Sequence, residues 1–598
     1  MRGQRKIHLA SVLIMLLPFV CFQQPFVRYI ASVVILIAVS ATGQAQTYSL
    51  VIGVDGLGPY GLQAASTPNL DKLMSGTWAG VGSAYRGAVA NHAYAGGVLG
   101  TATQQATLSG PGWSSIHTGV WNNLHGVTDN SFSGSRYTER PSYLKILESQ
   151  VPGIHTAGIS SWNPINNNLF APDGVNPNLD FRLGTNENDV QSTAAAVSQI
   201  ARLSNSNRGA IFVHLDDVDI AGHTTGAYSS NYLTNINDID SQVGSMLNAI
   251  KSRANFANEN WQVVVVADHG HLSGGGHGGQ TQMERTIPII VSSQNTQQGL
   301  ITADRRQPSM VDIPATVFNH FGVSAPAGQS GQALGQSVVG PSNVASLSNG
   351  LVSHLAFDGN TLGSPGTSGG TVVGNVQFTD GRFGQSVTVA QYGGGIVRLN
   401  QDLGALFSTN RDFAMSMWMK YESFTGDPAF FSNKNWNSGN NTGINLALQN
   451  LGGGSLDLNT KTDSAARQDI EPFGGLSAGE WQNLVFNVDR DGTSLLYVNG
   501  ALFGEIALTS AGSFDGAFNW TFLNDGTGAY SQGSITGLKM DEFGAWNRKL
   551  TLDEISYLSQ NSIQSVPEPS VGLLMMAASG AGVWWRSRSS RRSRPKAK

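Results

Sequence analysis

The sequence predicts an α/β domain with a mainly parallel sheet and helices on both faces, followed by an all-β jelly-roll sandwich. Over residues 46–340, apolar runs that each end in Asp or Gly alternate with helical segments, as buried parallel strands do in α/β proteins. From residue 351 the pattern changes to short alternating runs separated by turn residues, which is typical of an antiparallel sandwich. Charged residues make up only 13% beside 40% hydrophobic residues and 73 Gly, which excludes a coiled coil and a disordered polyampholyte.

Residues 1–45 are expected to be an export leader. Apolar runs at 7–22 and 29–41 are followed by the small residues Gly43 and Ala45, which suit a signal peptidase cut after Ala45. An uncleaved anchor and a later translation start are the alternatives. Export would place the folded body in the periplasm, on the outer surface or in the extracellular matrix.

Cysteine usage and charge limit the ligands and partners of the exported chain. The only cysteine, Cys21, lies in the leader, so a metal would be held by His, Asp, Glu or hydroxyl ligands. Without the leader and the last thirteen residues, 40 acidic residues stand against 24 basic ones, a charge of about −16. Such a body has no broad basic face, so no nucleic-acid polymer is expected as a partner beyond a nucleotide substrate.

The α/β segment contains four clear candidate strands and three candidate helices. The strands are expected at 48–56 (YSLVIGVDG), 209–217 (GAIFVHLDD), 261–270 (WQVVVVADHG) and 287–293 (IPIIVSS). The helices are expected at 69–76, 238–253 and 311–323, and a Gly-, Ser- and Pro-rich stretch ends in a linker at 341–350.

Residues able to bind metal or attack a substrate cluster where these strands end. Active-site loops lie at the carboxyl ends of parallel strands, and a pair of divalent ions needs about seven N or O ligands. Asp216, Asp217 and His271 are alternative candidate ligands. The clusters are Asp55, Ser109, Asp219 with His223, and Asp268 with His269 and His277.

Taken in this order, the clusters resemble the alkaline phosphatase superfamily, specifically its type I phosphodiesterase/nucleotide pyrophosphatase branch, over about residues 48–340. The Asp-x-x-Gly-His motif of that branch is matched by Asp219 to His223. The resemblance implies an alkaline phosphatase-like core with two divalent ions, expected to be Zn²⁺. One ion would be held by Asp55, Ser109, Asp268 and His269, and the other by Asp219, His223 and His277.

The same resemblance makes Ser109 the nucleophile. Pro111, Ser115, Thr118 and Gly119 follow it with the spacing of the motif T-x-P-x-x-x-S-x-x-T-G. Pro111 suits a first helical turn, so the Ser109 hydroxyl is expected at a helix N-terminus, where backbone N–H groups and the helix dipole favour a phosphate. A simple helix-capping role is the alternative for this serine.

Asn130 lies twenty-one residues beyond the nucleophile, the offset at which the family places a phosphate-binding Asn. Its amide could donate to a non-bridging phosphate oxygen, and a turn role is the alternative.

The sequence departs from the superfamily's patterns at three points, two of which bear on the expected activity. Trp113 stands where the sulfatase branch needs Arg, which disfavours a sulfatase. His277 follows His269 by only eight residues, whereas eukaryotic members usually place this ligand far downstream. No Arg stands beside the nucleophile to bind a phosphate dianion, which favours a diester monoanion.

The implied activity is hydrolysis of a phosphoric ester by two in-line displacements through a phosphoseryl intermediate. A phosphomonoesterase or phosphonate hydrolase on the same scaffold is the first alternative. A surface adhesion protein with an inactive hydrolase domain is the second.

Residues 351–560 resemble the laminin-G-like/concanavalin A-like jelly-roll superfamily, whose modules often bind glycans or Ca²⁺. Trp418 and Trp481 lie in alternating strand patterns and are expected in the core. An extracellular polysaccharide or Ca²⁺ could bind at the Asn-rich loop 433–443 or at Asp489 and Asp491, although turns use the same residue types.

The chain ends in a segment, 566–598, that resembles the PEP-CTERM sorting signal. Pro-Glu-Pro at 567–569 precedes an apolar stretch, 571–585, which is short for a stable membrane span, and an Arg-rich cluster follows. The resemblance implies transient anchoring in the inner membrane and cleavage by an exosortase-type transpeptidase. An ordinary transmembrane tail anchor is the alternative.

Overall fold

The computed structural model describes most of the chain from residue 46 to residue 563. The predicted leader (1–45) and sorting signal (566–598) and most of the linker lie outside the described residues. In the part that is described, no helix is both long and apolar enough to cross a bilayer. The segments within 46–563 that are not described are 204–207, 228, 302–306, 336–346, 365–366, 404–406, 408–410, 439, 450–454, 471–475, 491 and 508–511.

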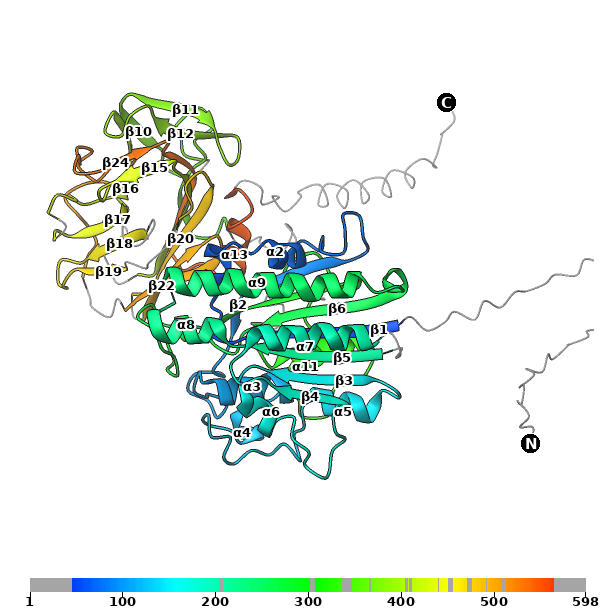
Figure 1. The fold of residues 1–598 in the computed structure, drawn as a ribbon. Coiled ribbons are helices and arrows are strands. Elements are labelled where there is room, and N and C mark those ends of the chain that lie inside the picture. The colour runs from blue at the N-terminus through cyan, green and yellow to red at the C-terminus, as the bar shows by residue number, and fades with distance from the viewer. Residues whose placement is uncertain are drawn as a thin grey trace, which may run out of the picture. The chain divides into compact units, whose positions relative to one another are not determined.

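The α/β domain is built on an eight-stranded sheet with the strand order β4-β3-β5-β1-β6-β7-β2-β8 (Figure 1). Neighbouring strands from β4 to β6 are parallel, which confirms the mainly parallel sheet. The strands are β1 (Gln46–Val54), β2 (Arg86–Tyr94), β3 (His155–Ser160), β4 (Phe181–Gly184), β5 (Arg208–Leu215), β6 (Glu259–Val266), β7 (Thr286–Ser293) and β8 (Gly299–Leu300).

Strand β7 differs from the sequence prediction, because it runs antiparallel to β6 and to β2. Its apolar run resembles that of a parallel strand. A parallel neighbour, however, needs a crossover that returns the chain to the other end of the sheet. Residues 267–285 contain only the short helix α10 (Gln282–Arg285) and make no such crossover, so β7 starts at the edge where β6 ends.

Helices cover both faces of this sheet, as predicted. Helices α7 (Asp189–Arg202) and α9 (Ser230–Lys251) pack side by side on one face (Figure 1). On the other face α3 (Ser109–Thr118) packs against α11 (Asp312–Phe321) and α5 (Tyr143–Gln150). The remaining helices of the domain are α1 (Pro59–Ala64), α2 (Pro68–Met74), α4 (Asn122–His125), α6 (Asn163–Asn168) and α8 (Asp217–Thr225).

Helix α3 begins at Ser109 and is buried throughout its length. Leu108 is still extended at the N-cap, and Pro111 lies in the first turn, where a missing N–H costs nothing. The helix ends at Gly119, whose φ of 69° is left-handed and whose N–H bonds to the Ser115 carbonyl. The predicted helix N-terminus at Ser109 is therefore confirmed.

The second domain is an antiparallel sandwich of two sheets, as predicted from the alternating runs. One sheet has the order β10-β13-β23-β16-β17-β18-β19, and the other β11-β12-β25-β14-β20-β21-β22, with β9 paired to β25. The principal strands are β14 (Phe413–Lys420), β16 (Ala429–Ser432), β17 (Gly443–Gln449), β18 (Ser455–Lys461), β20 (Gln482–Val488), β21 (Thr493–Val498), β22 (Ala501–Ala507) and β25 (Lys539–Trp546).

The short strands of this sandwich are β9 (Leu351–Leu355), β10 (Gly370–Gly374), β11 (Val376–Asp380), β12 (Gln385–Val389), β13 (Gly395–Leu399), β15 (Ser423–Thr425), β19 (Gln468–Ile470), β23 (Thr521–Phe522) and β24 (Ser534–Thr536). Helix α13 (Leu552–Leu558) follows the last strand.

Alternate residues of the facing strands form the sandwich core. Met415, Met417 and Met419 of β14 and Ile444 and Leu446 of β17 belong to one buried apolar cluster. The expected hairpin is present, since β20 pairs with β21.

Of the two tryptophans expected in this core, Trp418 is buried, with 3% of its surface exposed, whereas Trp481 is only half-buried.

Two buried histidines, His117 in helix α3 and His125 in helix α4, are expected to make the α/β domain sensitive to acid. Burial lowers the pKa of His117 and of His125 to about 3 each, and in the case of His117 a nearby histidine, His214, adds to the effect. The folded protein keeps both rings neutral, whereas the unfolded chain binds protons below about pH 6.5. Stability is therefore lost as the pH falls from about 6.5 towards the folded-state pKa values.

We expect His117→Asn to flatten this pH dependence by up to about 1.4 kcal/mol per pH unit, because one proton fewer is taken up on unfolding. The free energy of unfolding in urea at pH 7.5 and pH 5.5 measures the effect. Ser241→Ala, at an exposed position of α9 without a titratable group, is the control and should leave the slope unchanged. An unchanged slope in His117→Asn would contradict the assignment.

Candidate functional site

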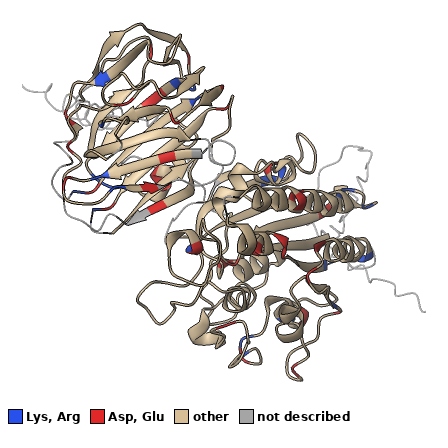
Figure 2. Cartoon of the chain, turned by 60° about the vertical axis from the view of Figure 1, so that its left-hand side comes forward, with Lys and Arg blue, Asp and Glu red and all other residues tan. Residues whose placement is uncertain are grey.

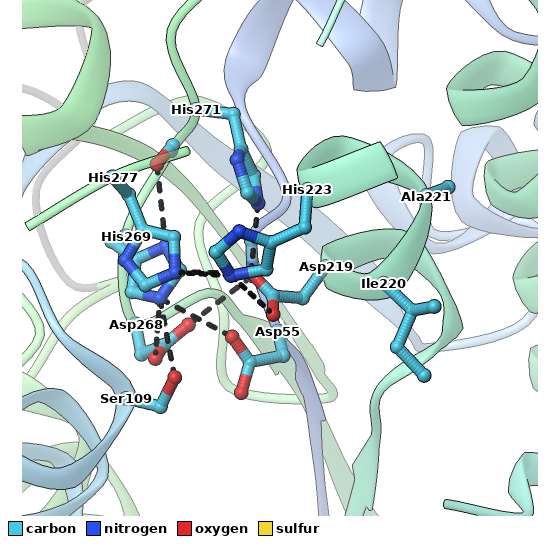
Figure 3. A network of polar contacts seen from close by, with 12 residues as sticks. Asp55, Ser109, Asp219, Ile220, Ala221, His223, Asp268, His269, His271 and His277 are labelled. Carbon is cyan, nitrogen blue, oxygen red and sulfur yellow. Dashed lines mark hydrogen bonds and ion pairs between the residues drawn. The ribbon is translucent and has the colours of Figure 1, made fainter. Parts of the chain in front are cut away.

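Three adjacent strands deliver acidic residues to one edge of the α/β sheet. Val54 of β1 lies beside Leu215 of β5, and Gly53 lies beside Val266 of β6. The residues that follow these strands, Asp55, Asp216 and Asp268, therefore emerge together. Helix α8 then carries Asp219 and His223 one turn apart, and α3 brings Ser109 to the same place (Figure 3).

The first group of side chains surrounds the imidazole of His269. Its Nε2 atom lies 3.3 Å from Asp55 Oδ1, 3.3 Å from Asp268 Oδ2 and 3.4 Å from Ser109 Oγ. The two carboxylate oxygens are buried and accept no hydrogen bond from any described residue. Buried acceptors of this kind are costly unless a cation faces them. These four residues, the set implied by the resemblance, thus fit one divalent ion.

The second group is centred on Asp219. Its Oδ2 lies 3.4 Å from His223 Nε2, and its Oδ1 lies 3.5 Å from His277 Nε2 and 2.7 Å from His271 Nε2. The Nε2 atoms of His223 and His277 are 2.9 Å apart. Figure 3 shows the imidazoles turned towards the carboxylate. The predicted ligands are thus brought together, and His271 lies among them.

Sequence reasoning missed two residues that hold Asp55 in place. Trp113 Nε1 donates to Asp55 Oδ2 at 2.8 Å, and His214 Nε2 donates to the same oxygen at 3.0 Å. Trp113 can lie against β1 because residue 53 is Gly, since a Cβ there would be 2.5 Å from the indole ring. The one sequence signal for His214 was that this polar residue interrupts the apolar run of β5.

Burial and mutual repulsion set the protonation of this centre. Burial would raise the pKa of Asp55, but the hydrogen bond from His214, the nearby His269 and the Trp113 N–H lower it below its usual range. Burial and the charges of Asp55 and Asp219 raise the pKa of Asp268 well above its usual range. Burial also lowers the pKa of His269, which favours the neutral imidazole that can ligate a metal.

Asn130 is exposed to solvent and contacts the backbone beside Ser109. Its Oδ1 accepts a hydrogen bond of 2.8 Å from the N–H of Gly110, the residue after Ser109. With the oxygen used in this way, the Nδ2 group is the part of the amide suited to a phosphate oxygen. Phosphate binding by Asn130 stays a prediction.

Asp216 and Asp217, the alternative candidate ligands at the start of α8, lie outside the two groups just described. The N–H groups of Asp216 and Asp217 both donate to the carboxylate of Asp189. The side chain of Asp216 groups with Asp55 and His214, and burial raises its pKa to about 8. Asp217 belongs to none of the Asp and His groups found among the described residues.

Several candidate binding residues of the second domain are engaged in contacts within the domain. In the loop 433–443, Asn441 bonds to the backbone N–H and carbonyl of Asn435, which closes the loop on itself. Asp489 pairs with Lys549, and Asp491 lies outside the described residues. Glycan or Ca²⁺ binding by this domain stays a prediction.

Family comparisons divide the chain in the same way. Residues 49–288 match the family of type I phosphodiesterase / nucleotide pyrophosphatase, and residues 392–556 match the concanavalin A-like lectin/glucanases superfamily. The chain therefore contains a domain of the alkaline phosphatase superfamily followed by a concanavalin A-like domain.

Curated relatives include GPI ethanolamine phosphate transferase 1 of Chaetomium globosum, 27% identical over 207 residues, or 32% of this chain and 21% of the relative. The enzyme of the same name from Aspergillus oryzae is 24% identical over 264 residues, or 38% of this chain and 25% of the relative. The matched region thus spans a quarter or less of these relatives.

Among solved structures, the botulinum neurotoxin serotype G binding domain is 15% identical with a TM-score of 0.30, covering 35% of this chain and 50% of that chain. Domain 4 of AbnA, an extracellular arabinanase from Geobacillus stearothermophilus, is 24% identical with a TM-score of 0.27, covering 35% of this chain and 98% of that chain.

We expect Gly56→Ala to damage the second group of ligands. Gly56 has a φ of 70°, and a Cβ there would lie 2.7 Å from His271 Nε2 and 2.9 Å from Asp219 Oδ1. The left-handed backbone and the crowding together should cost roughly 1–3 kcal/mol of stability and weaken zinc binding.

Gly58→Ala is the matched control, because its Cβ would meet only Tyr232 Oη, at 3.9 Å. Unfolding in urea and the zinc retained after dialysis measure both variants. Equal stability and equal zinc retention in the two variants would contradict this packing of Gly56 against His271 and Asp219.

Proposed function

We propose that residues 46–340 form a metal-dependent phosphodiesterase in which Ser109 is the nucleophile and Asn130 binds the phosphate. The observation that carries this is the convergence of Ser109 Oγ, His269 Nε2 and two unpartnered carboxylate oxygens in a domain of a phosphodiesterase family. Two divalent ions, expected to be Zn²⁺, would be held by the residues of the two groups. When bound, they would supply positive charge that lowers the pKa of the Ser109 hydroxyl and offsets charge on the phosphoryl group.

The chain's own residues position the reacting groups. Ser109 is the first residue of α3, so its hydroxyl lies at the positive end of the helix dipole, which favours an approaching phosphate. Its Oγ forms a bond to phosphorus as the bond to the leaving alcohol breaks, and the alcohol leaves with a proton. A water molecule then displaces Ser109 from the phosphoseryl intermediate, and the two inversions retain configuration at phosphorus.

The charge around the nucleophile favours a phosphodiester over a phosphomonoester. Residues 105–119 contain no Arg or Lys, so this segment offers no fixed cation for the second negative charge of a monoester. A diester monoanion needs only one negative charge offset. Phosphomonoester or phosphonate hydrolysis on the same scaffold is the alternative.

The curated relatives favour a second possible reaction of the phosphoseryl intermediate, which is transfer of its phosphoryl group to an alcohol. They are named ethanolamine phosphate transferases, and a phosphoseryl group can pass to an alcohol as well as to water. Mass spectrometry of the products formed with and without added alcohols distinguishes transfer from hydrolysis.

We expect Ser109→Ala to lower the hydrolysis of bis-p-nitrophenyl phosphate roughly a thousandfold or more, because the nucleophile is lost. Ser241→Ala, at an exposed position of α9, is the control and should retain wild-type activity. Zinc content and the rates on bis-p-nitrophenyl phosphate and p-nitrophenyl phosphate are measured together.

A higher rate on the monoester would support the phosphomonoesterase alternative instead. Full activity in Ser109→Ala would contradict the assigned nucleophile. A folded protein that retains no metal and cleaves neither ester would favour an adhesion protein with an inactive hydrolase domain.

We propose that the protein acts outside the cytoplasm, with the jelly-roll domain retaining it on an extracellular polysaccharide. The leader, the PEP-CTERM-like tail and the concanavalin A-like domain support this proposal. Cell fractionation is expected to recover the protein in the periplasm, on the surface or in the matrix, shortened at both ends by signal peptidase and an exosortase-type transpeptidase. Recovery of the intact chain from the cytoplasm would contradict it.

A further inference from the structure

Two buried histidines outside the expected ligand set, His214 and His271, contact the two aspartates Asp55 and Asp219. Neighbouring ligand atoms of a tetrahedral zinc site lie about 3.3 Å apart, given bonds of about 2.0–2.1 Å. The His269 contacts to Asp55 and Asp268 and the His223 and His277 contacts to Asp219 are 3.3–3.5 Å long and match this spacing.

The two additional histidines lie closer to their carboxylates than this spacing. His214 is 3.0 Å from Asp55 Oδ2, and His271 is 2.7 Å from Asp219 Oδ1. These are hydrogen-bond lengths. One pair of expected ligands, His223 and His277, is also closer than a zinc site requires, at 2.9 Å. Distance alone therefore does not separate a metal ligand from a hydrogen-bond donor, and the other contacts of His214 and His271 are needed to assign their roles.

The hydrogen bonds of His214 fix which ring nitrogen carries the proton. Its Nδ1 accepts from the N–H of Trp162 at 3.4 Å, so Nε2 carries the proton and donates to Asp55 Oδ2. Trp113 donates to the same oxygen. Asp55 Oδ1 is left facing His269 and Asp268 without a hydrogen bond among the described residues.

His271 is packed closely against two glycines. Its side chain is fully buried, and a Cβ at Gly56 or Gly222 would lie 2.7 Å or 2.6 Å from its Nε2. From there it reaches Asp219 Oδ1, while Asp219 Oδ2 faces His223 (Figure 3). One oxygen of each aspartate is thus hydrogen-bonded to a buried imidazole, and the other oxygen faces His269 in the case of Asp55 and His223 in the case of Asp219. His277 approaches Asp219 through Oδ1, at 3.5 Å.

We propose that His214 and His271 are positioning residues, each donating an N–H to one oxygen of a metal-binding aspartate and so directing the other oxygen to the ion. Neither histidine is a ligand, and His277 takes the ligand position for which His271 was the other candidate. This inference rests on the proposed function, because it presupposes two bound divalent ions.

Glutamine at position 271 separates the two roles. Its amide can place an N–H where the histidine Nε2 stands, but it is a poor zinc ligand. Zinc content after dialysis and zinc dissociation constants from competition with a chelator are measured on the purified full-length protein. His271→Gln should keep both ions, with affinities within about threefold of wild type, whereas His271→Ala should weaken one ion about 10–100-fold.

His277→Gln is the comparison variant and should lose one ion outright, because it removes a ligand. His155→Gln, at the start of β3, is the control and should bind like wild type. His214→Gln and His214→Ala should show the same contrast as the position-271 pair, on the other ion. Thermal unfolding of each variant with excess chelator checks that the metal-free protein folds.

Loss of one ion in His271→Gln, as in His277→Gln, would make His271 a ligand and overturn the proposal. Unchanged zinc affinity in His271→Ala would overturn it as well, because no positioning effect would exist. If the wild-type protein retains no zinc, the proposed function fails and this inference fails with it.

Discussion

The repulsion among three aspartates, Asp55, Asp219 and Asp268, is the constraint on which the rest of the α/β domain depends. They face one another where β5, β1 and β6 end, with at most 8% of any of them exposed. Like charges in a poorly polarisable interior cannot all remain ionised without cations, and burial together with the charges of Asp55 and Asp219 raises the pKa of Asp268. Bound divalent ions would relieve the repulsion, so metal binding and folding of this edge are expected to be coupled.

The sequence was sufficient to predict which edge of the sheet holds these aspartates, because residues that follow neighbouring parallel strands emerge at the same edge. Asp55 and Asp268 follow apolar runs, and Ser109 precedes a proline that suits a first turn. The direction of β7 could not be predicted, since an apolar run is compatible with either direction. Spacing alone could not separate His271 from His277 either, because both follow His269 within one glycine-rich loop.

The side chains that hold the candidate ligands in place were harder to predict than the candidate ligands themselves. His214 and Trp113 are buried within a strand and a helix, where histidine and tryptophan commonly serve packing, and only the fold brings both to Asp55. In the second domain, the sequence instead suggested binding residues whose observed contacts are structural. Asparagines that suggested a binding loop form the hydrogen bonds that shape the loop, as Asn435 and Asn441 do.

The unequal exposure of the candidate ligands has a consequence for the exchange rates of bound ions. Half of the His223 side chain, 51%, is exposed to solvent, whereas the side chains of Asp55 and Asp268 are at most 1% exposed and that of His269 is fully buried. An ion held by the Asp219 group would lie beside an exposed imidazole, whereas an ion held by the His269 group would be surrounded mostly by buried side chains. The two ions would therefore exchange at very different rates, and a mixed-metal enzyme could be prepared by brief exposure to a second cation.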